Sequence, residues 1–330
     1  MQVIIPVAGK GTRMRPHTHT IPKPLLHVAG KPVIDYILDE LKELPVSEVI
    51  FITGHLKEHF EEHMKATYDF KMRFIEQEVL DGTSGAIRLA RDYIHEDVLI
   101  IFADTIFDSD LSILKNFPHD GAIWCSKVED HRRWGIIITD DDGFMTKLIE
   151  KPDKPYTRLA NIGMHYMKNY KLLFECIEEQ YEKDLKAKGE YPLPEAHSMM
   201  CERGEKHKAI QVEGWYDTGK PETVLATQEV LLHRRHREGK TKKTEIIKPV
   251  YIEDGSDVEG CVIGPNVSIA KGAVVKNSVV KNSIIGVDSS VENCSLEESF
   301  VGDEAKVFGV SGKVNVGDHS EVVIGDEDNT

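Results

Sequence analysis

The stretch PVAGKGTRMRP, residues 6–16, places two glycines and three cations directly after an apolar segment that we expect to be the first strand. Gly9 and Gly11 would let backbone N–H groups approach an anion closely, and the cations would neutralise it. The cations are Lys10, Arg13 and Arg15. A dinucleotide fingerprint would need a third glycine at Met14, and a Walker loop would need G-K-[ST] at its end. The stretch therefore predicts a phosphate site of another kind.

Two aspartates are candidate metal ligands. Asp104 ends the apolar run in IIFADTIF (100–107), and Asp217 lies in GWYDTGKP (214–221). An aspartate at the carboxyl end of a central strand lies where Mg²⁺ and phosphates meet in α/β proteins. For Asp104, a helix N-cap is the alternative interpretation.

The elements that must position these residues alternate between strands and helices up to about residue 220. The expected strands are 2–7, 48–53, 72–77, 98–104 and 121–126. They are nearly continuous in hydrophobicity, which is typical of strands buried on both faces. Helical periodicity covers 33–41 and 84–94, and a helix follows from about residue 222. The alternation predicts an α/β, Rossmann-like domain with a mixed, mostly parallel sheet and ligands at the carboxyl ends of its strands.

A different pattern begins at about residue 250. Apolar residues recur every five or six positions, from Ile252 to Val307, with glycine, asparagine and serine between them. Strands of a β-sandwich recur at roughly 8–12 residues, so this spacing favours a hexapeptide β-helix. Its length allows roughly three coils.

We therefore expect four segments. A first domain covers 1–238, a basic linker 239–249, a short left-handed β-helix 250–310, and a weakly ordered acidic tail 311–330.

The motifs GKGTRMRP and PKPL (22–25) together closely resemble the signature of the sugar-1-phosphate nucleotidyltransferases, or NDP-sugar pyrophosphorylases. These enzymes join a sugar 1-phosphate to a nucleoside triphosphate. The segments EQEVLDGTSGA (76–86), RWGIII (133–138), LIEKP (148–152) and ANIG (160–163) extend the resemblance through the first domain. With its β-helix, the chain is most similar to long-form glucose-1-phosphate thymidylyltransferases and uridylyltransferases.

The resemblance implies a role for each matching residue. Arg13 would contact the leaving β,γ-phosphates, Lys23 the α-phosphate, and Asp104 the metal; these three would be catalytic. The nucleotide-binding residues would be Ala8, Gly9, Gly11, Thr12, Gln77, Gly82 and Thr83. The sugar-phosphate-binding residues would be Gly135, Glu150, Lys151 and Asn161, with Lys151 on the phosphate. Asp104 and Asp217 would hold Mg²⁺.

The nucleotide implied is dTTP or UTP. A Gln77 amide offers a donor and an acceptor, which suits the N3–H and O4 edge of thymine or uracil. Lys10 and Ala103 depart from many thymidylyltransferases and resemble some uridylyltransferases, so the choice between the two nucleotides stays open. Glucose 1-phosphate is the favoured sugar phosphate.

Three other functions compete with this interpretation. N-acetylglucosamine-1-phosphate uridylyltransferase is the nearest alternative. A CoA-dependent acyltransferase could use the β-helix, but His319 lies outside the expected repeats and no inserted loop brings a candidate histidine. A non-catalytic regulatory homologue would typically have lost the signature cations or aspartates, and all four are present: Arg13, Lys23, Asp104 and Asp217.

The composition excludes several partners. With 56 acidic residues against 41 lysines and arginines, a net charge of −15 should repel nucleic acid and anionic membranes. Five scattered cysteines and no apolar run long enough for a span or an export signal indicate a cytoplasmic protein. We expect a homo-oligomer. His17 and His19 lack a third ligand at metal-site spacing, so we expect solvated loop histidines.

Overall fold

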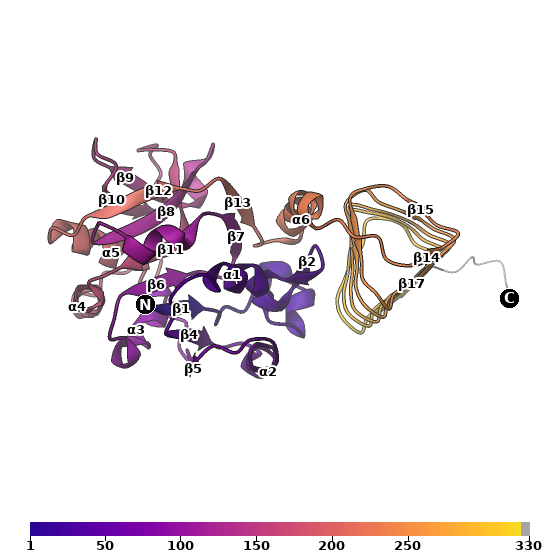
Figure 1. Ribbon diagram of the computed structural model, residues 1–330, viewed down its shortest axis with the longest axis horizontal. Coiled ribbons are helices and arrows are strands. Elements are labelled where there is room, and N and C mark those ends of the chain that lie inside the picture. The colour runs from indigo at the N-terminus through magenta and orange to yellow at the C-terminus, as the bar shows by residue number, and fades with distance from the viewer. Residues whose placement is uncertain (325–330) are drawn as a thin grey trace. The chain divides into compact units, whose positions relative to one another are not determined.

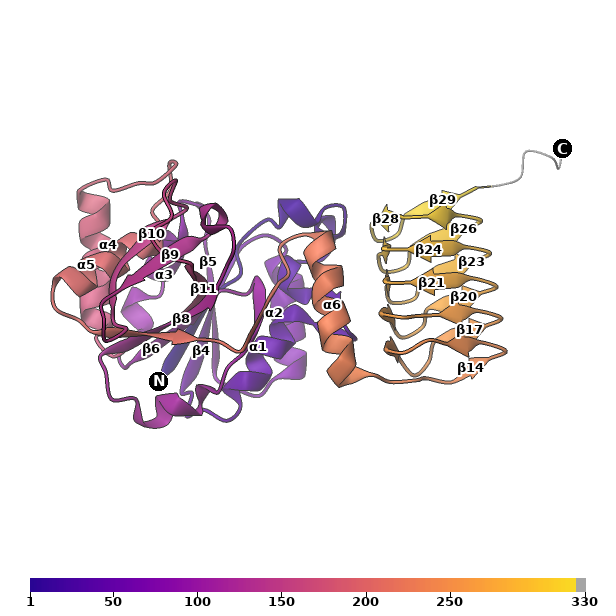
Figure 2. The same cartoon turned by 90° about the horizontal axis from the view of Figure 1, so that it is seen from above.

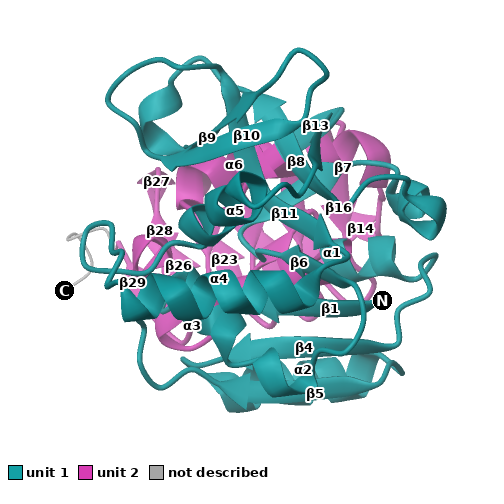
Figure 3. Ribbon diagram, turned by 90° about the vertical axis from the view of Figure 1, so that its left-hand side faces the viewer, with its two compact units in different colours: residues 1–10, 37–215 teal, residues 11–36, 216–330 magenta. Residues whose placement is uncertain are grey.

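The computed structural model describes residues 1–324 and divides the chain into two compact units (Figure 3). The first unit combines Met1–Lys10 with Ile37–Trp215. The second combines Gly11–Tyr36 with the chain from Tyr216 onward. The segment that carries the signature cations therefore belongs to the same unit as the repeats, although it follows the first strand directly in sequence.

A nine-stranded mixed sheet forms the first unit (Figure 1). Its path runs β10-β9-β11-β6-β1-β4-β5, and β8 adds to β11 and β12 to β8. The strands are β1 (Gln2–Pro6), β4 (Glu48–Thr53), β5 (Met72–Glu76), β6 (Val98–Ile101), β8 (Gly121–Lys127), β9 (Gly135–Thr139), β10 (Met145–Glu150), β11 (Leu159–Met167) and β12 (His207–Gln211). The five strands predicted from apolar runs are all present, as β1, β4, β5, β6 and β8.

The central strands β6, β1, β4 and β5 are parallel to one another. Ile4 of β1 aligns with Ile50 and Ile100 on its neighbours, and all three side chains are fully buried. β11 runs antiparallel to β6 and makes the sheet mixed. Buried residues at the centre of the sheet pack against α3, α4 and α5, which accounts for the apolar character of these strands.

The helices are α1 (Val33–Leu41), α2 (Lys57–Thr67), α3 (Thr83–Arg88), α4 (Tyr170–Glu182), α5 (Leu193–Glu202) and α6 (Pro221–Arg235). The helix expected over 84–94 is shorter, since α3 ends at Arg88 and a separate 3-10 turn covers Arg91–Tyr93. Four short strands complete the catalogue before the repeats: β2 (His27–Val28), β3 (Lys31–Pro32), β7 (Thr105–Asp108) and β13 (Gly214–Asp217). Within residues 1–324, none of the helices has the length and apolarity that a bilayer span requires.

The repeats form three parallel stacks of short strands, consistent with a left-handed β-helix (Figure 2). One stack is β14 (Thr241–Lys242), β17 (Asp257–Glu259), β20 (Val274–Lys276), β23 (Ser290–Glu292), β26 (Lys306–Phe308) and β29 (Glu321–Val323). The second is β15 (Glu245–Ile246), β18 (Val262–Ile263), β21 (Val279–Lys281), β24 (Ser295–Glu297) and β27 (Ser311–Gly312). The third is β16 (Val250–Ile252), β19 (Val267–Ile269), β22 (Ile284–Ile285), β25 (Phe300–Val301) and β28 (Asn315–Val316).

The periodic apolar residues build the core of these coils. Val258, Val275, Val291 and Val307 align in register along one stack and are at most 1% exposed. Asparagines such as Asn277 adopt a positive φ at the turns between strands, which their short polar side chains tolerate. Each coil thus buries its apolar residues only by stacking on the next.

The β-helix is longer than the sequence predicted. β14 and β15 fall in the expected linker at 239–249, and β27, β28 and β29 fall in the expected acidic tail. Val316 and Val322 continue the inward-facing apolar period there, which is the physical reason for the extension. The stacks hold six, five and five strands, so the estimate of three coils was also too low. The last part of the expected tail, residues 325–330, lies outside the described residues.

Candidate active site

In the first unit, the nucleotide-site candidates gather at one edge of the sheet. Ala8 and Gly9 follow β1, Gln77 follows β5, and Asp104 follows β6, so all come after the carboxyl ends of neighbouring parallel strands. At the end of β4, a Cβ on Gly54 would lie 2.8 Å from the Ala8 carbonyl oxygen, so only a glycine lets these two loops approach. This edge is where α/β sheets bind ligands.

Gln77 is 8% exposed, and its side chain is oriented by two neighbours. Its Nε2 lies 3.4 Å from Asp81 Oδ1 and 3.5 Å from the Gly82 carbonyl oxygen. Asp81 Oδ2 accepts a hydrogen bond of 2.5 Å from the Tyr181 hydroxyl. Asp81 and Tyr181 were not expected from the sequence, because a contact across 100 residues leaves no local pattern.

The loop at Gly82 and Thr83 is held by a distant segment. Gly82 has φ of +121°, and a Cβ there would lie 2.5 Å from the Tyr191 carbonyl oxygen, so glycine is required. The Tyr191 carbonyl accepts from the Ser84 N–H at 2.9 Å, and Thr83 Oγ1 accepts from the Leu193 N–H at 2.8 Å. These bonds fix the backbone that would face the nucleotide.

Asp104 lies beside the strand that carries Asn161. The Phe102 N–H donates to the Gly163 carbonyl oxygen at 2.9 Å, and the Thr105 hydroxyl donates to the Ile162 carbonyl oxygen at 3.4 Å. Residues on either side of Asp104 are therefore bonded to the ANIG segment of β11.

The predicted sugar-phosphate residues lie together. Gly135 of β9 is paired with Glu150 of β10, and a Cβ on Gly135 would lie 3.1 Å from Glu150 Oε2 and 3.8 Å from the Asn161 Cβ. Lys151 Nζ forms an ion pair of 2.8 Å with Glu150 Oε1 and is 46% exposed. The Lys151 N–H also donates to the Trp134 carbonyl at 3.0 Å. This arrangement places one cation and several hydrogen-bonding groups beside a buried glycine whose missing side chain lets Glu150 and Asn161 approach it.

A buried histidine orients the Asn161 amide. Asn161 Oδ1 accepts from the Gly163 N–H at 2.9 Å, so its Nδ2 points toward His165 Nε2, 3.4 Å away. His165 is 1% exposed, and its burial lowers its pKa to about 3, so the ring is neutral and Nε2 accepts. Residues four apart on a regular strand lie about 13 Å from each other. The strand is irregular between Asn161 and His165, where Gly163 has φ of +82°, and this irregularity brings the two side chains together, so spacing alone could not have indicated the pair.

The second unit holds the remaining candidates. Gly11 adopts a left-handed conformation, and a Cβ there would lie 2.9 Å from Thr18 Cγ2 and 3.1 Å from Lys23 Cβ. Thr12 begins a 3-10 turn that ends at Met14. The loop is thus folded back on itself, which brings the GKGTRMRP and PKPL motifs together.

Asp217 and Arg13 approach each other at a glycine. Asp217 Oδ1 accepts from the Gly219 N–H at 2.7 Å. A Cβ on Gly219 would lie 2.8 Å from Asp217 Oδ1 and 3.5 Å from Arg13 Nη2, so any side chain would crowd both groups. Gly219 was not among the residues expected from the sequence, although a glycine two residues after an aspartate is typical of such a turn.

Two sequence expectations are wrong in this unit. His17 is 1% exposed rather than solvated, while His19 is exposed as expected. His319, expected outside the repeats, lies within the coils, between β28 and β29, because the β-helix extends further than expected; its Nδ1 is 3.3 Å from Glu304 Oε2.

The donor chemistry suits Mg²⁺. Among residues 1–324, no three histidine, cysteine or acidic side chains converge as a complete metal cage. Mg²⁺ is usually held by one or two carboxylates together with substrate phosphates and water, so an aspartate in either unit is a ligand of the right chemistry without a complete protein cage.

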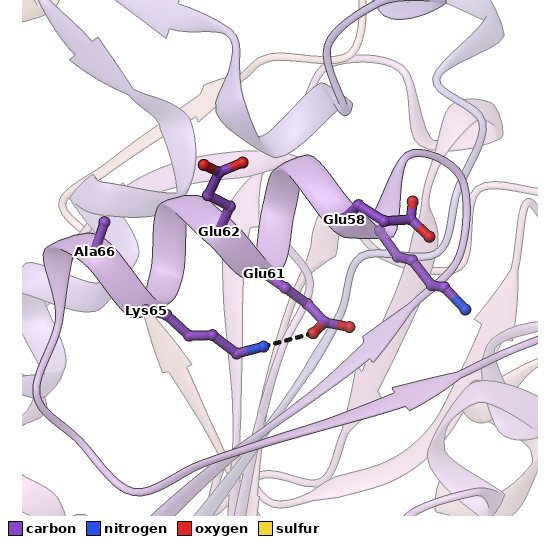
Figure 4. Close-up of a pocket in the computed structure, with 6 residues that line it drawn as sticks. Glu58, Glu61, Glu62, Lys65 and Ala66 are labelled. Atoms are coloured by element: carbon purple, nitrogen blue, oxygen red, sulfur yellow. Dashed lines mark hydrogen bonds and ion pairs between the residues drawn. The ribbon is translucent and has the colours of Figure 1, made fainter.

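A separate shallow pocket lies on α2 and contains none of the predicted site residues (Figure 4). Lys57, Glu58, Glu61, Glu62, Lys65 and Ala66 line it. Lys65 and Glu61 form an ion pair of 2.8 Å across one helical turn, a solvated arrangement with no convergent binding groups.

Comparisons with known proteins agree with the geometry. The family model described as "Nucleotidyl transferase" matches residues 2–234. "Bifunctional protein GlmU" of Methanocaldococcus jannaschii is 33% identical over 260 residues, covering 78% of this chain and 61% of that protein. "UTP--glucose-1-phosphate uridylyltransferase AglF" of Haloferax volcanii is 31% identical, covering 67% of this chain and 93% of that protein.

The chain thus spans about three fifths of the GlmU proteins that it matches, 61% and 62% of the first two. A solved structure of UDP-glucose pyrophosphorylase complexed with UDP-glucose superposes with a TM-score of 0.62 at 23% identity. The match covers 71% of this chain and 98% of that one, and at this identity it shows a shared fold.

Proposed function

This chain belongs to the nucleotidyl transferase family, and on that premise we propose that it transfers a nucleotidyl group from UTP or dTTP to a sugar 1-phosphate. The products would be an NDP-sugar and pyrophosphate. Glucose 1-phosphate is the first candidate, because the AglF relative is named a UTP–glucose-1-phosphate uridylyltransferase.

The observation that carries the proposal is the cluster of Gly135, Glu150, Lys151 and Asn161 in the unit where Asp104 and Gln77 follow parallel strands. Lys151 offers an exposed cation to a phosphate, and the carboxylate of Glu150 can accept from sugar hydroxyls. The absence of a side chain at Gly135 lets the Glu150 carboxylate approach that backbone closely.

In the proposed reaction, an oxygen of the sugar phosphate attacks the α-phosphorus of the triphosphate in line. A new P–O bond forms as the bond between the α-phosphorus and the bridging oxygen breaks, and pyrophosphate takes the electron pair. Arg13 would stabilise the departing phosphates, Lys23 the α-phosphate, and Lys151 the attacking phosphate. The sugar phosphate is already ionised at neutral pH, so no general base is needed.

Asp104 and Asp217 are proposed to hold Mg²⁺, which when bound would neutralise phosphoryl charge. The carboxylates themselves would be fixed by their neighbours, Asp217 through the Gly219 N–H and Asp104 through the flanking bonds to β11.

The test is pyrophosphate release by the full chain with Mg²⁺, glucose 1-phosphate, and dTTP, UTP, GTP, ATP or CTP in turn. We expect release with dTTP or UTP and its loss in Asp104→Asn. Release only with GTP or ATP would overturn the role of Gln77 while keeping the reaction class. If no pyrophosphate is released with any of the five nucleotides, whether the sugar phosphate is that of glucose, N-acetylglucosamine, mannose or galactose, the proposal is overturned.

A second candidate, N-acetylglucosamine-1-phosphate uridylyltransferase, is favoured by the GlmU relatives. Measuring kcat/KM for glucose 1-phosphate and for N-acetylglucosamine 1-phosphate, with the same nucleotide, distinguishes the two candidate functions: the sugar phosphate with the higher value is the preferred substrate.

A further inference from the structure

One face of the β-helix differs from the others in its outward side chains. In the stack β16-β19-β22-β25-β28, the register aligns a single outward row: Tyr251, Ser268, Ile284, Phe300 and Asn315. The next residue of each strand, such as Ile285 or Val301, belongs to the buried core of the coils. Because side chains alternate along a strand, the row must point away from that core.

This outward row is covered. Ile284 is 2% exposed and Phe300 is 5% exposed, although neither belongs to the core of the coils. On the neighbouring stack, the outward Lys281 and Glu297 are exposed. Some other part of the second unit therefore packs on this face.

The covering segment is the one that carries the signature cations. The ring of His17 stacks on Phe300 with centroids 3.9 Å apart and an interplanar angle of 23°. His17 Nε2 lies 2.6 Å from Asn315 Oδ1, an acceptor, so the ring donates there. Burial lowers the pKa of His17, which keeps the ring neutral against the phenyl face.

Contacts on both sides of His17 extend this anchor. The Thr20 hydroxyl donates to Asp318 Oδ2. A Cβ on Gly317 would lie 2.9 Å from Pro16 Cβ, so the coil approaches the loop at a residue without a side chain. Pro16, His17 and Thr20, which belong to one 3-10 turn and its caps, therefore all meet the last coils.

A second anchor lies at the other end of the row. The Tyr251 ring occupies the space where a Gly30 side chain would lie, 2.2 Å from its Cβ position. The Arg235 Nε–H donates to the Ala29 carbonyl at 3.0 Å. Gln228 of α6 is fully buried; its Oε1 accepts from Ser268 Oγ at 2.6 Å and from the Ala29 N–H at 3.3 Å.

In sequence, Lys23 lies between the first anchor (residues 16–20) and the second (residues 29–30). Arg13 lies three residues before the first anchor, so both proposed phosphate-binding cations are close to residues that contact the β-helix. Building on the proposed function, we propose that the β-helix positions the triphosphate-binding segment, with His17 as the positioning residue that Phe300 and Asn315 hold. The β-helix would then contribute to nucleotide binding in each chain, besides any role in assembly.

The test compares steady-state kinetics of Asn315→Leu and Phe300→Leu with the full wild-type chain. Loss of one hydrogen bond that orders the loop should raise KM for the nucleoside triphosphate about three- to tenfold. KM for the sugar phosphate should stay unchanged, because Gly135, Glu150, Lys151 and Asn161 belong to the first unit. Asn315→Asp, which keeps an oxygen acceptor for His17, should retain the wild-type KM.

Two controls separate positioning from general damage. His19→Ala changes the exposed histidine two residues from His17, and Ser311→Ala changes an exposed residue on the adjacent strand β27; neither should alter KM. A rise in both KM values together, or a lowered unfolding midpoint with both KM values unchanged, would overturn the proposal.

Amide hydrogen exchange over residues 11–25 provides a readout that needs no nucleotide. Asn315→Leu should accelerate exchange there, and Ser311→Ala should not. Unchanged exchange in Asn315→Leu would overturn the proposal. If the wild-type chain releases no pyrophosphate, the proposed function fails, and the exchange experiment still decides whether the β-helix orders the loop.

Discussion

The amide nitrogen of Asn161 lies 3.4 Å from Nε2 of His165, on the same face of β11. With Oδ1 already accepting from the Gly163 N–H, this contact leaves the Asn161 amide one orientation. The pair fixes a polar side chain beside Gly135 and Glu150, where the sugar is proposed to bind.

We expect Asn161→Ala to raise KM for glucose 1-phosphate about tenfold, the effect of losing one or two hydrogen bonds to a bound sugar. His165→Leu should produce a smaller rise, because the amide remains but loses one of its two orienting partners. KM for the nucleotide is the internal control, and an equal rise in both constants would contradict the assignment.

Gln77→Leu should weaken discrimination among bases. The substitution removes the donor and acceptor proposed for the pyrimidine edge while keeping a side chain of similar length. We expect kcat/KM for UTP or dTTP to fall at least tenfold and that for the other nucleotides to change little. An unchanged base preference in a five-nucleotide panel would refute the role of Gln77.

Gly219→Ala should impair catalysis without unfolding the protein. Its methyl group would lie 2.8 Å from Asp217 Oδ1 and 3.5 Å from Arg13 Nη2. We expect kcat to fall at least tenfold, and Gly219→Val to be worse, with the far-UV circular dichroism unchanged. Full activity in Gly219→Val would contradict this prediction, because it would show that catalysis does not depend on the positions of the Asp217 and Arg13 side chains beside Gly219.

Three buried histidines should make the protein less stable in mild acid. His165, His197 and His207 are each 1% exposed, and burial lowers the pKa of each below 6.5, to about 3 for His165 and about 4 for His207. The unfolded chain takes up protons below about pH 6.5 while the folded chain does not. Stability is therefore lost as pH falls, by about 2 kcal/mol per histidine at pH 5.

Urea unfolding at pH 7.5, 6 and 5 measures this loss. His197→Leu should reduce the pH dependence and should not destabilise at pH 7.5, because neither ring nitrogen of His197 has a hydrogen-bond partner among the described residues. His59→Leu, at an exposed position of α2, is the matched control. The same pH slope in both variants would exclude the buried histidines as its source.

Asp303 should have the opposite pH effect within the β-helix. Burial, with Asp318 and Asp288 nearby, raises its pKa to about 6. A carboxyl group whose folded pKa is raised stabilises the protein at low pH, and that stability is lost as pH rises through about 4 to 6. The Val287 N–H donates to Asp303 Oδ1 at 2.7 Å. The Asp303→Asn side chain keeps an oxygen that can accept this hydrogen bond.

At pH 7.5 we expect Asp303→Asn to raise the free energy of unfolding by about 1–2 kcal/mol. Glu297→Gln, an exposed change on β24, should leave it unaltered. Destabilisation by Asp303→Asn would mean that the ionised form is the one the coils require.

The sequence predicted the fold well where periodicity reports burial. Strands β1, β4, β6 and β8 were recognised because each is an almost unbroken apolar run, and the β-helix because its valines repeat. β5, at the edge of the sheet, is only half-buried and was recognised from its Met72, Phe74 and Ile75. The ends of the β-helix were misplaced, since its first coil lies in a lysine-rich stretch expected to be a linker, and the coil with Val316 lies in a segment expected to be an acidic tail.

The candidate site was predicted from motifs, and its supporting contacts were not. Motifs are local, so they located Gly135, Glu150, Lys151 and Asn161. The burial of His17 depends on Asn315, 298 residues away, and no spacing rule applies at that separation. A histidine in a polar loop sequence was therefore expected to be solvated.

The row from Tyr251 to Asn315 has a consequence for how this repeat array can change. In a solenoid each coil contacts only its neighbours, so gain or loss of a coil is commonly tolerated. Here the segment between Gly30 and His17 touches the row at both ends. Deleting one coil would move Asn315 by about 4.8 Å, beyond hydrogen-bond range of His17. Because residues 17–30 contact Tyr251 at one end of the row and Phe300 and Asn315 at the other, the number of coils between these contacts cannot change without breaking one of them.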